Sequence, residues 1–468
     1  MTSMHRVAIG YLVIPFVLWA LIWCELYISL PIAVLAGILF VNLARGITWS
    51  ITKTQIMVLV AGMLLAGVSR AFGVFDQYNG DWVKHFGILQ ALVDGSWPVQ
   101  IGEEYLRYYM GYYIVPAGVA KIFGYEVLRF ALGLWTGLGI GLFLLLLTRR
   151  MTFRMALVVV GLVVIFSGVD YLKALGDFLP EGLVYHLEPI TVPLDTVREL
   201  SMRDGTTFIE GEIWSLQISS FATLLMFVPQ HLISGMIGAM LLIHLSRNPE
   251  YLKYSLLVIA ACAFWSPFVA IGLAILQLVQ TRDFRQYISG YNLAAIPIGI
   301  LLLLYISAGP RVGELWIAQR LDVYLGILML WLEIGALLAI LIWIRPSLLR
   351  SRLFLASVAS IIGLSFLHFG YFNDLLMRGT IPAMTVLLYY LSRLIRKWAN
   401  NQIAPLPKSV LTMVLLLALI GPVVEYVRSI GSASTVDLVF HWNYAAEIEP
   451  NMVQYLADKT AILEMILR

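Results

Sequence analysis

Apolar segments long enough to cross a bilayer as helices, about 17 to 25 residues each, recur along the whole sequence. Only 13% of the 468 residues are charged, whereas a soluble domain carries roughly 25%. Backbone N–H and C=O groups inside lipid need partners within their own segment, and a helix supplies those partners. The sequence therefore predicts an all-α, polytopic integral membrane protein.

The distribution of lysine and arginine predicts how the spans are oriented. Both residue types prefer the cytoplasmic side, which places the N-terminus and the loop 45–53 inside. Loops 76–126 and 167–228 then face the periplasm or exterior of a cell inner (plasma) membrane. We expect about eleven spans in one transmembrane domain, residues 1–425, followed by a short external tail, 426–468.

The stretch 254–280 decides the sidedness of everything after it. If it crosses the membrane, every later basic loop falls outside; if it folds back at the Trp-Ser-Pro sequence 265–267, those loops become cytoplasmic. We therefore predict a re-entrant hairpin there. Irregular backbone at that depth must be buried in protein or line a cavity, so we expect this turn near the functional site. Interfacial helices are expected at 105–123 and 215–228.

The first polar stretch of any length, residues 76–85, contains the leading catalytic candidates. Asp76 and Asp81 lie where a span leaves the membrane, and an ionisable residue there is a functional hypothesis when it faces a cavity. If residues 81–95 are helical, Asp81, Lys84 and His85 share one face. A carboxylate held by such cations stays ionised and could act as a general base. The alternative is a solvated helix cap.

Further candidates follow at other external helix ends. Asp170 opens the second external loop and could face the first carboxylate, or could be an ordinary helix-end aspartate. His231 begins a span after a proline and could present a donor to an anion. Arg378 lies just outside a span, where its planar guanidinium group could donate two hydrogen bonds to phosphate oxygens. Asn373 and Asp374 could orient it. Lipid-headgroup contact is the alternative for Arg378.

Several kinds of site are absent from the sequence. Cys24 and Cys262 both lie in apolar segments, so no disulfide or zinc site is expected. There is no P-loop, dinucleotide-binding glycine motif or nucleophile elbow. No cofactor is required by the pattern, although carboxylates at Asp76, Asp81 and Asp170 could bind Mg²⁺ or Mn²⁺ weakly. Nothing in the sequence suggests nucleic acid as a partner.

The order of these motifs resembles the GT-C superfamily of polytopic membrane glycosyltransferases. The resemblance covers most of residues 55–392, although three spans precede the acidic loop where that superfamily usually has one. The matching positions follow a D-x-x-x-H…L…G-x-W-P pattern, a tyrosine-rich segment and a second acidic loop: Asp81, His85, Leu92, Gly95, Trp97, Pro98, Tyr108, Phe123, Gly124 and Asp170. The Asp-Trp-x-Lys-His, Phe-Ser-Gly-x-Asp, Pro-Gln-His and Asn-Asp-x-x-x-Arg-x-x-Ile-Pro segments also resemble those of a bacterial membrane-protein group.

The resemblance implies transfer of a sugar from a polyprenyl-phosphate donor to a glycan, lipid or protein acceptor on the outer face. Asp81, with Asp76 or Asp170, would be catalytic. The substrate-binding set would be Lys84, His85, Tyr108, Tyr109, His231, Asn373, Asp374 and Arg378. Two other classes remain open: a secondary transporter or lipid flippase, and a non-catalytic assembly or export subunit.

Overall fold

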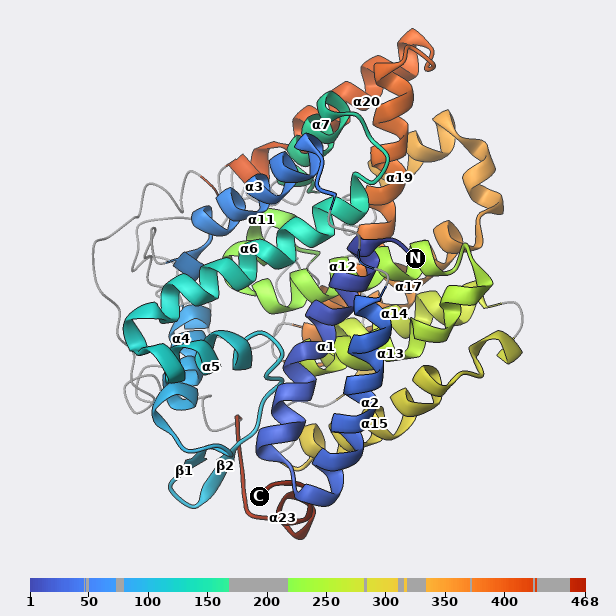
Figure 1. Ribbon diagram of the computed structural model, residues 1–468. Helices are drawn as coiled ribbons and strands as arrows, with labels where there is room; N and C mark the ends of the chain where they lie inside the picture. The colour runs from blue at the N-terminus through green and yellow to red at the C-terminus, as the bar shows by residue number, and fades with distance from the viewer. Residues whose placement is uncertain are drawn as a thin grey trace.

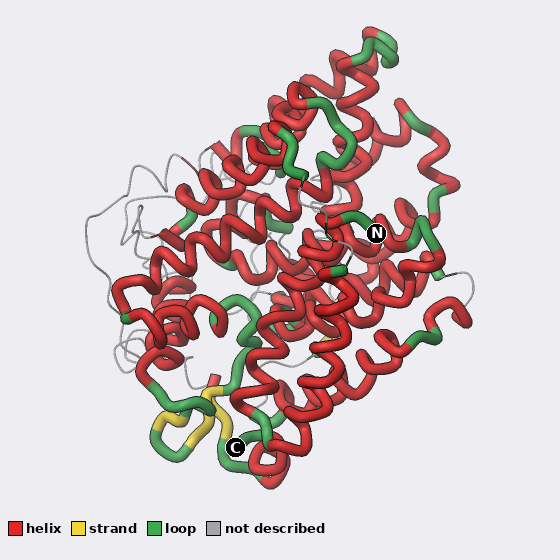
Figure 2. Tube along the Cα trace, in the orientation of Figure 1, coloured by secondary structure: helices red, strands yellow, loops and turns green. Residues whose placement is uncertain are grey.

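Long apolar helices make up most of the computed structural model, and the short strands are few (Figure 2). The structure describes residues 1–45, 47, 50–72, 80–167, 218–281, 284–309, 315–317, 334–370, 373–423, 426 and 455–468. Within these ranges, six helices are long and apolar enough to cross a membrane: Ser3–Trp23, Leu26–Ala44, Tyr125–Leu147, Gly290–Ser307, Asp374–Ala399 and Pro405–Val423. The mostly helical character is therefore confirmed and compatible with a membrane protein.

The main helices, in chain order, are α1 (Ser3–Trp23), α2 (Leu26–Ala44), α3 (Lys53–Val68), α4 (Gly80–Asp94), α5 (Ile114–Phe123), α6 (Leu128–Leu147), α7 (Phe153–Val164), α11 (Phe221–Phe227), α12 (Pro229–Leu245), α13 (Ser255–Trp265), α14 (Pro267–Gln280), α15 (Gly290–Ser307), α17 (Arg352–Ser365), α18 (Asp374–Gly379), α19 (Ile381–Ala399), α20 (Pro405–Ala418) and α23 (Ala461–Ile466). A further apolar helix covers Ile334–Ile344. Short 3-10 turns are η1 (Arg70–Phe72), η2 (Tyr125–Val127), η4 (Pro249–Tyr254), η5 (Phe284–Tyr287) and η6 (Pro346–Arg350).

Helix α12 lies at the centre of the bundle. It packs against α1, α6, α13, α14 and α19 (Figure 1), and nearly all of its side chains are buried. Elsewhere, small residues let helices approach closely: a Cβ at Gly62 of α3 would lie 2.6 Å from the backbone nitrogen of Gly141 in α6. Such close backbone approach is how apolar helices gain packing energy without a hydrophobic driving force between them.

The predicted break at residues 265–267 is present between α13 and α14. Pro267 occupies the first turn of α14 and cannot donate an N–H, while the Ser266 side chain caps that helix by accepting from the Val269 N–H at 3.4 Å. The chain then doubles back, because η5 after α14 contacts η4 before α13. Both ends of this hairpin therefore lie on the same side, with the turn buried inside the molecule.

The region predicted as external loop 76–126 is largely folded over its described part. It forms α4, the hairpin of β1 (Gln100–Ile101) and β2 (Glu104–Leu106), and α5. The expectation of a helix over 105–123 is wrong at its start, because residues 104–106 form β2 and α5 begins only at Ile114. Aromatic side chains favour extended backbone, and Leu106 donates its N–H to Val99 across the hairpin at 2.9 Å.

The end of the chain returns to this region. Strand β5 (Leu456–Ala457) pairs antiparallel with β2 to give the sheet order β1-β2-β5. Helix α23 then lies beside the connection between α1 and α2, where Arg468 donates from Nε to the Cys24 carbonyl at 2.6 Å. A second pair, β3 (Trp316–Ile317) with β4 (Leu367–His368), is separate. The tail thus forms part of the sheet beside α4 and α5 (Figure 1).

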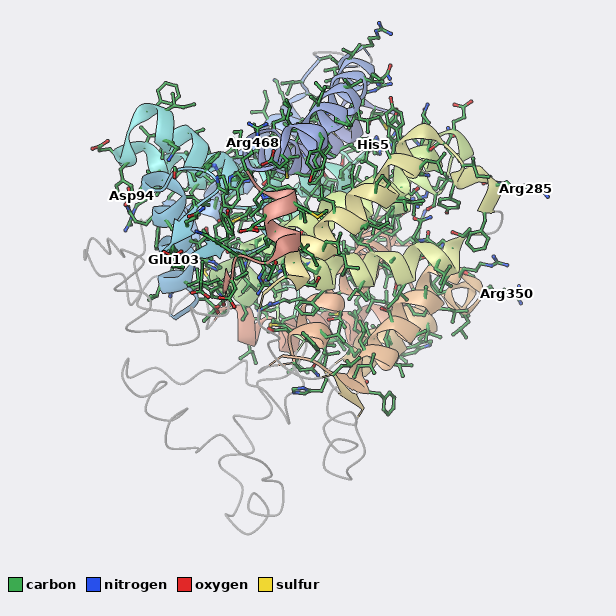
Figure 3. The ribbon with its side chains drawn as sticks, turned by 90° about the horizontal axis from the view of Figure 1, so that it is seen from below. His5, Asp94, Glu103, Arg285, Arg350 and Arg468 are labelled. Atoms are coloured by element: carbon green, nitrogen blue, oxygen red, sulfur yellow. The ribbon has the colours of Figure 1, made fainter. Side chains whose placement is uncertain are left out.

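Labelled charges occupy opposite edges of the molecule. In Figure 3, the acidic residues Asp94 and Glu103 lie at the edge that carries α4 and the hairpin, whereas Arg285 and Arg350 lie at the far edge. Helix α19 has Arg378 just before its start and Arg396 and Lys397 in its last turn. Lys459 pairs with Glu103 at 3.5 Å, so cations as well as carboxylates occur at the edge that carries the hairpin.

Candidate functional site

Asp81 lies in the first turn of α4, where a negative charge complements the helix dipole. Its Oδ1 accepts a hydrogen bond from Lys84 Nζ at 2.6 Å, one helical turn away. The Asp81 side chain is 33% exposed and that of Lys84 only 8%. Burial alone would raise the pKa of Asp81, but the charge of Lys84 outweighs it and holds that pKa below its usual range. Asp81 is therefore ionised at neutral pH and reachable from solvent.

His85 is fully buried, and protein groups contact both of its ring nitrogens. Nε2 lies 2.9 Å from the Phe227 carbonyl oxygen and Nδ1 lies 2.7 Å from the Tyr113 hydroxyl. A carbonyl only accepts, so Nε2 carries the proton and Tyr113 donates to Nδ1. Burial first, and then the charge of Lys84, lower the pKa of His85 to about 3. The geometry thus favours a positioning role for His85 over the substrate contact expected from the sequence.

Two adjacent tyrosines form an aromatic wall after β2. The rings of Tyr108 and Tyr109 are 3.8 Å apart, and Tyr455 from the C-terminal segment meets Tyr108 edge-on at 4.7 Å. Tyr455 is held there by its carbonyl, which accepts the Arg107 N–H at 2.7 Å. Segments distant in sequence therefore build one surface.

The aromatic segment is fixed against the turn between α13 and α14. Gly111 donates its N–H to the Phe264 carbonyl at 3.0 Å. A Cβ at Gly111 would lie 2.5 Å from Cγ of Trp265 and 2.9 Å from its Cα. Only glycine allows such an approach, so the predicted placement of this turn beside the site agrees with the structure.

Arg378 enters the same region from the short helix α18. Asn373, at φ 50°, caps that helix by accepting the Leu376 N–H at 3.4 Å. Arg378 forms an ion pair with Asp374 Oδ1 at 2.7 Å and donates to the Tyr109 hydroxyl at 3.2 Å. Its side chain is 11% exposed. Asp374 thus holds Arg378 directly, whereas Asn373 acts by starting the helix.

His231 completes the contact with Tyr109. Pro229 begins α12 and places Gln230 and His231 in its first turn, both fully buried. His231 Nε2 lies 3.4 Å from the Tyr109 hydroxyl and 3.3 Å from Gln230 Nε2. Tyr109 therefore bridges Arg378 and His231.

The α4 group and the Arg378 group belong to one electrostatic cluster. The positive charge of Arg378 is among those that lower the pKa of Asp81, and it also opposes the rise that burial imposes on the pKa of Tyr108. Within the described residues, the buried polar atoms of this region without a hydrogen-bond partner include Tyr108 Oη, Gln230 Oε1, His231 Nδ1 and Arg378 Nε. Buried polar atoms are almost always paired, so these groups are suited to contacting a polar ligand.

Two predicted acids lie outside the described residues: Asp76 and Asp170. The structure therefore brings together Asp81, Lys84, Tyr108, Tyr109, His231, Asp374 and Arg378, and leaves the position of those two acids untested. No group of three His, Cys, Asp or Glu side chains suited to a metal occurs among the residues that the structure describes. The weak Mg²⁺ or Mn²⁺ site stays a prediction, because two of its three ligands are those acids.

Two contributors were not predicted from the sequence. Tyr455 arrives through the β2–β5 pairing, which leaves no local pattern, and Tyr113 positions His85. Gln230 was expected, because the Pro-Gln-His sequence places an amide beside the histidine at a helix start, and it contacts His231.

Comparison of the chain with protein-family models, with curated proteins and with solved structures finds no match. The interpretation of the site therefore rests on its residues and their geometry.

Proposed function

We propose that this protein is a membrane glycosyltransferase that moves a sugar from a polyprenyl-phosphate donor to a hydroxyl acceptor. The observation that carries the proposal is an ionised, half-buried carboxylate, Asp81, paired with the buried Lys84 at 2.6 Å, within the electrostatic influence of Arg378, which is itself paired with Asp374. Sugar transfer from a lipid phosphate needs both: a base for the acceptor and positive charge for the leaving phosphate. The tyrosine wall beside them, in which Tyr108 is buried and Tyr109 and Tyr455 are partly exposed, suits a sugar ring.

Asp81 would act as the general base. The acceptor oxygen attacks the anomeric carbon, its proton passes to the Asp81 carboxylate, and the carbon–oxygen bond to phosphate breaks with its electron pair on the phosphate oxygen. Because Asp81 is already ionised, it needs no prior deprotonation. One base suffices for transfer with inversion, without a covalent intermediate.

Arg378 and Lys84 would neutralise the departing phosphate. Arginine presents a planar fork that matches two phosphate oxygens. Asp374 and Tyr109 already hold the terminal nitrogens of Arg378, so its orientation is fixed before the donor arrives. Such preorganised charge costs no rearrangement at the moment of bond breaking.

The proposal includes the membrane arrangement expected from the sequence. A GT-C-like architecture with about eleven spans, a cytoplasmic N-terminus and a periplasmic or external Asp81 would let a lipid-linked donor reach the site sideways. Arg396 and Lys397 in the last turn of α19 would then face inward, in agreement with the preference of arginine and lysine for the cytoplasmic side.

Proteoliposomes with purified protein would test this directly. Radiolabelled polyprenyl-phosphate sugars and glycan or lipid acceptors are supplied to wild type, Asp81→Asn and the control Asp94→Asn. Asp94 is exposed and lies at the other end of the same helix. We expect the transfer rate of Asp81→Asn to fall by about 10²-fold to 10⁴-fold, while this variant still binds donor. Asp94→Asn should transfer sugar at the wild-type rate. Equal transfer by both variants would overturn Asp81 as base.

The second candidate is a transporter or lipid flippase, and the broken hairpin α13–α14 favours it. Discontinuous helices with buried turns are typical of transporter binding sites. A flippase would move a fluorescent polyprenyl-phosphate sugar across the bilayer without an acceptor and without breaking its glycosidic bond. Acceptor-independent movement with no labelled product would replace the transferase proposal by this one.

A further inference from the structure

A basic pocket lies at the opposite end of the molecule from Asp81. It has a volume of about 330 Å³ and is formed by the helix Ile334–Ile344, η6 and the last turns of α19 and the residues after it. Four cationic side chains line it: Arg345, Arg393, Arg396 and Lys397. Its other lining residues are Leu341, Leu348, Tyr390, Leu394, Asn400 and Gln402. None of the lining residues is acidic.

Helix-end charge alone does not explain this arrangement. Arg396 and Lys397 complement the negative end of α19, but Arg345 comes from a separate element and Arg393 from the turn before. Like charges that face one cavity repel each other, and no ion pair in the described part of the chain joins any of them to a carboxylate. An anion in the pocket would turn this repulsion into attraction.

The chemistry of the lining points to a phosphate group. Arginine guanidinium groups bind two phosphate oxygens at once, and the amides of Asn400 and Gln402 can donate to the remaining oxygens, while the Tyr390 hydroxyl is hydrogen-bonded to Ser351 Oγ at 2.6 Å. About 330 Å³ lies at the lower end of the range for small-molecule sites. That size suits a headgroup rather than a nucleotide.

The position along α19 distinguishes a lipid headgroup from a free phosphate. The helical span Asp374–Ala399, which combines α18 and α19, rises about 28 Å from Arg378 to Lys397, close to the roughly 30 Å hydrocarbon thickness of a bilayer. Figure 1 shows the C-terminal end of α19 at the extremity of the molecule away from α4. Near Arg345 in sequence, Trp343 is 49% exposed and Leu349 is 52% exposed. Exposed tryptophan with arginine is typical of the membrane–water boundary.

We propose that this pocket binds the phosphate of an anionic phospholipid headgroup at the membrane face opposite the Asp81 site. The acyl chains would lie along the exposed apolar surface that includes Trp343. This proposal needs the protein to lie in a membrane, but it does not depend on sugar transfer.

Native mass spectrometry of the full-length protein in detergent would test it with three probes: phosphatidylglycerol, phosphatidylcholine and inorganic phosphate. The variant is Arg345→Gln/Arg396→Gln, and the matched control is Arg285→Gln/Arg350→Gln, since neither residue of the control lines the pocket. We expect wild type and control to retain phosphatidylglycerol over phosphatidylcholine. The pocket variant should bind phosphatidylglycerol between about tenfold and about 100-fold more weakly, since each lost arginine contact weakens binding by up to about tenfold.

Each other outcome has a definite meaning. Unchanged phosphatidylglycerol binding by the pocket variant overturns the site. Displacement of phosphatidylglycerol by equimolar inorganic phosphate overturns the lipid assignment in favour of a soluble phosphate compound. If the glutamine variant fails to fold, Arg345→Lys/Arg396→Lys keeps the charge and removes the forks; it should bind phosphatidylglycerol more weakly than the control, and equal binding contradicts the proposal.

Discussion

Replacing Gly111 by alanine tests how the aromatic segment is held over the site. The added Cβ would lie 2.5 Å from Cγ of Trp265, whereas ordinary contact begins at 3.4 Å. Turning the indole does not relieve the overlap, because Cα of Trp265 would also be only 2.9 Å away. The segment and the hairpin turn must therefore move apart by about 1 Å, since closely packed interiors leave no slack.

The magnitude of the effect follows from these contacts. Overpacking in a buried site costs about 1–3 kcal/mol, and the Gly111 N–H to Phe264 hydrogen bond adds about 1 kcal/mol when it is lost. We expect the free energy of unfolding to fall by about 2–4 kcal/mol. A 1 Å displacement of Tyr109 relative to Arg378 would also reduce sugar transfer by about 100-fold.

Thermal unfolding in detergent and the proteoliposome transfer reaction measure the two effects. The matched control is Gly363→Ala in α17, where a Cβ meets nothing within 4 Å; alanine there should leave stability unchanged or raise it by about 0.5–1 kcal/mol. We expect the order of stability to be Gly363→Ala, wild type, Gly111→Ala. Equal unfolding temperatures and transfer rates for the two variants would refute the close contact and the positional argument built on it.

Three further outcomes are expected from the transfer reaction. Tyr109→Phe removes the hydroxyl between Arg378 and His231, so kcat/KM should fall about tenfold; a wild-type value would show that this hydroxyl does not position Arg378. Arg378→Lys keeps the charge but loses the fork, and donor binding measured by ultracentrifugation should weaken about tenfold; unchanged binding would contradict the phosphate contact. Because the pKa of Asp81 lies below its usual range and the ionised form is the base, the transfer rate should stay constant as pH falls to about 4. Lys84→Gln should raise the pKa of Asp81, so the loss of activity in acid should begin at a higher pH than in wild type. The same onset in both proteins would argue against the effect of Lys84 on this pKa.

The parts of the site built from local spacing were predictable. Asp81 and Lys84 meet because residues one turn apart on a helix are neighbours, and Asp374 meets Arg378 for the same reason. The break at Ser266 followed from the sidedness of distant basic loops combined with Pro267. These predictions needed only periodicity, charge and the special backbone of proline.

Long-range pairing was not predictable. Tyr455 reaches Tyr108 only because β5 adds to β2, and a two-residue strand leaves no recognisable pattern. The helix expected from residue 105 was wrong at its start, because hairpin bonds and the contact of Gly111 with Trp265 override helical periodicity. From the sequence, His85 and Lys84 were both expected to bind substrate. Only the fold shows that Tyr113 and the Phe227 carbonyl hydrogen-bond to the ring nitrogens of His85.

The pairing of β2 with β5 also sets an order for biosynthesis. Tyr105 pairs with Ala457, so roughly 350 residues separate the two strands, and a ribosome adding about 5–20 residues per second needs roughly 20 to 70 s to cover them. For that interval the nascent chain carries Asp81 and Tyr108 without Tyr455 against them. The candidate spans that precede Tyr455 in the chain would therefore be synthesised before the aromatic wall is complete, and its closure would be a late event of folding.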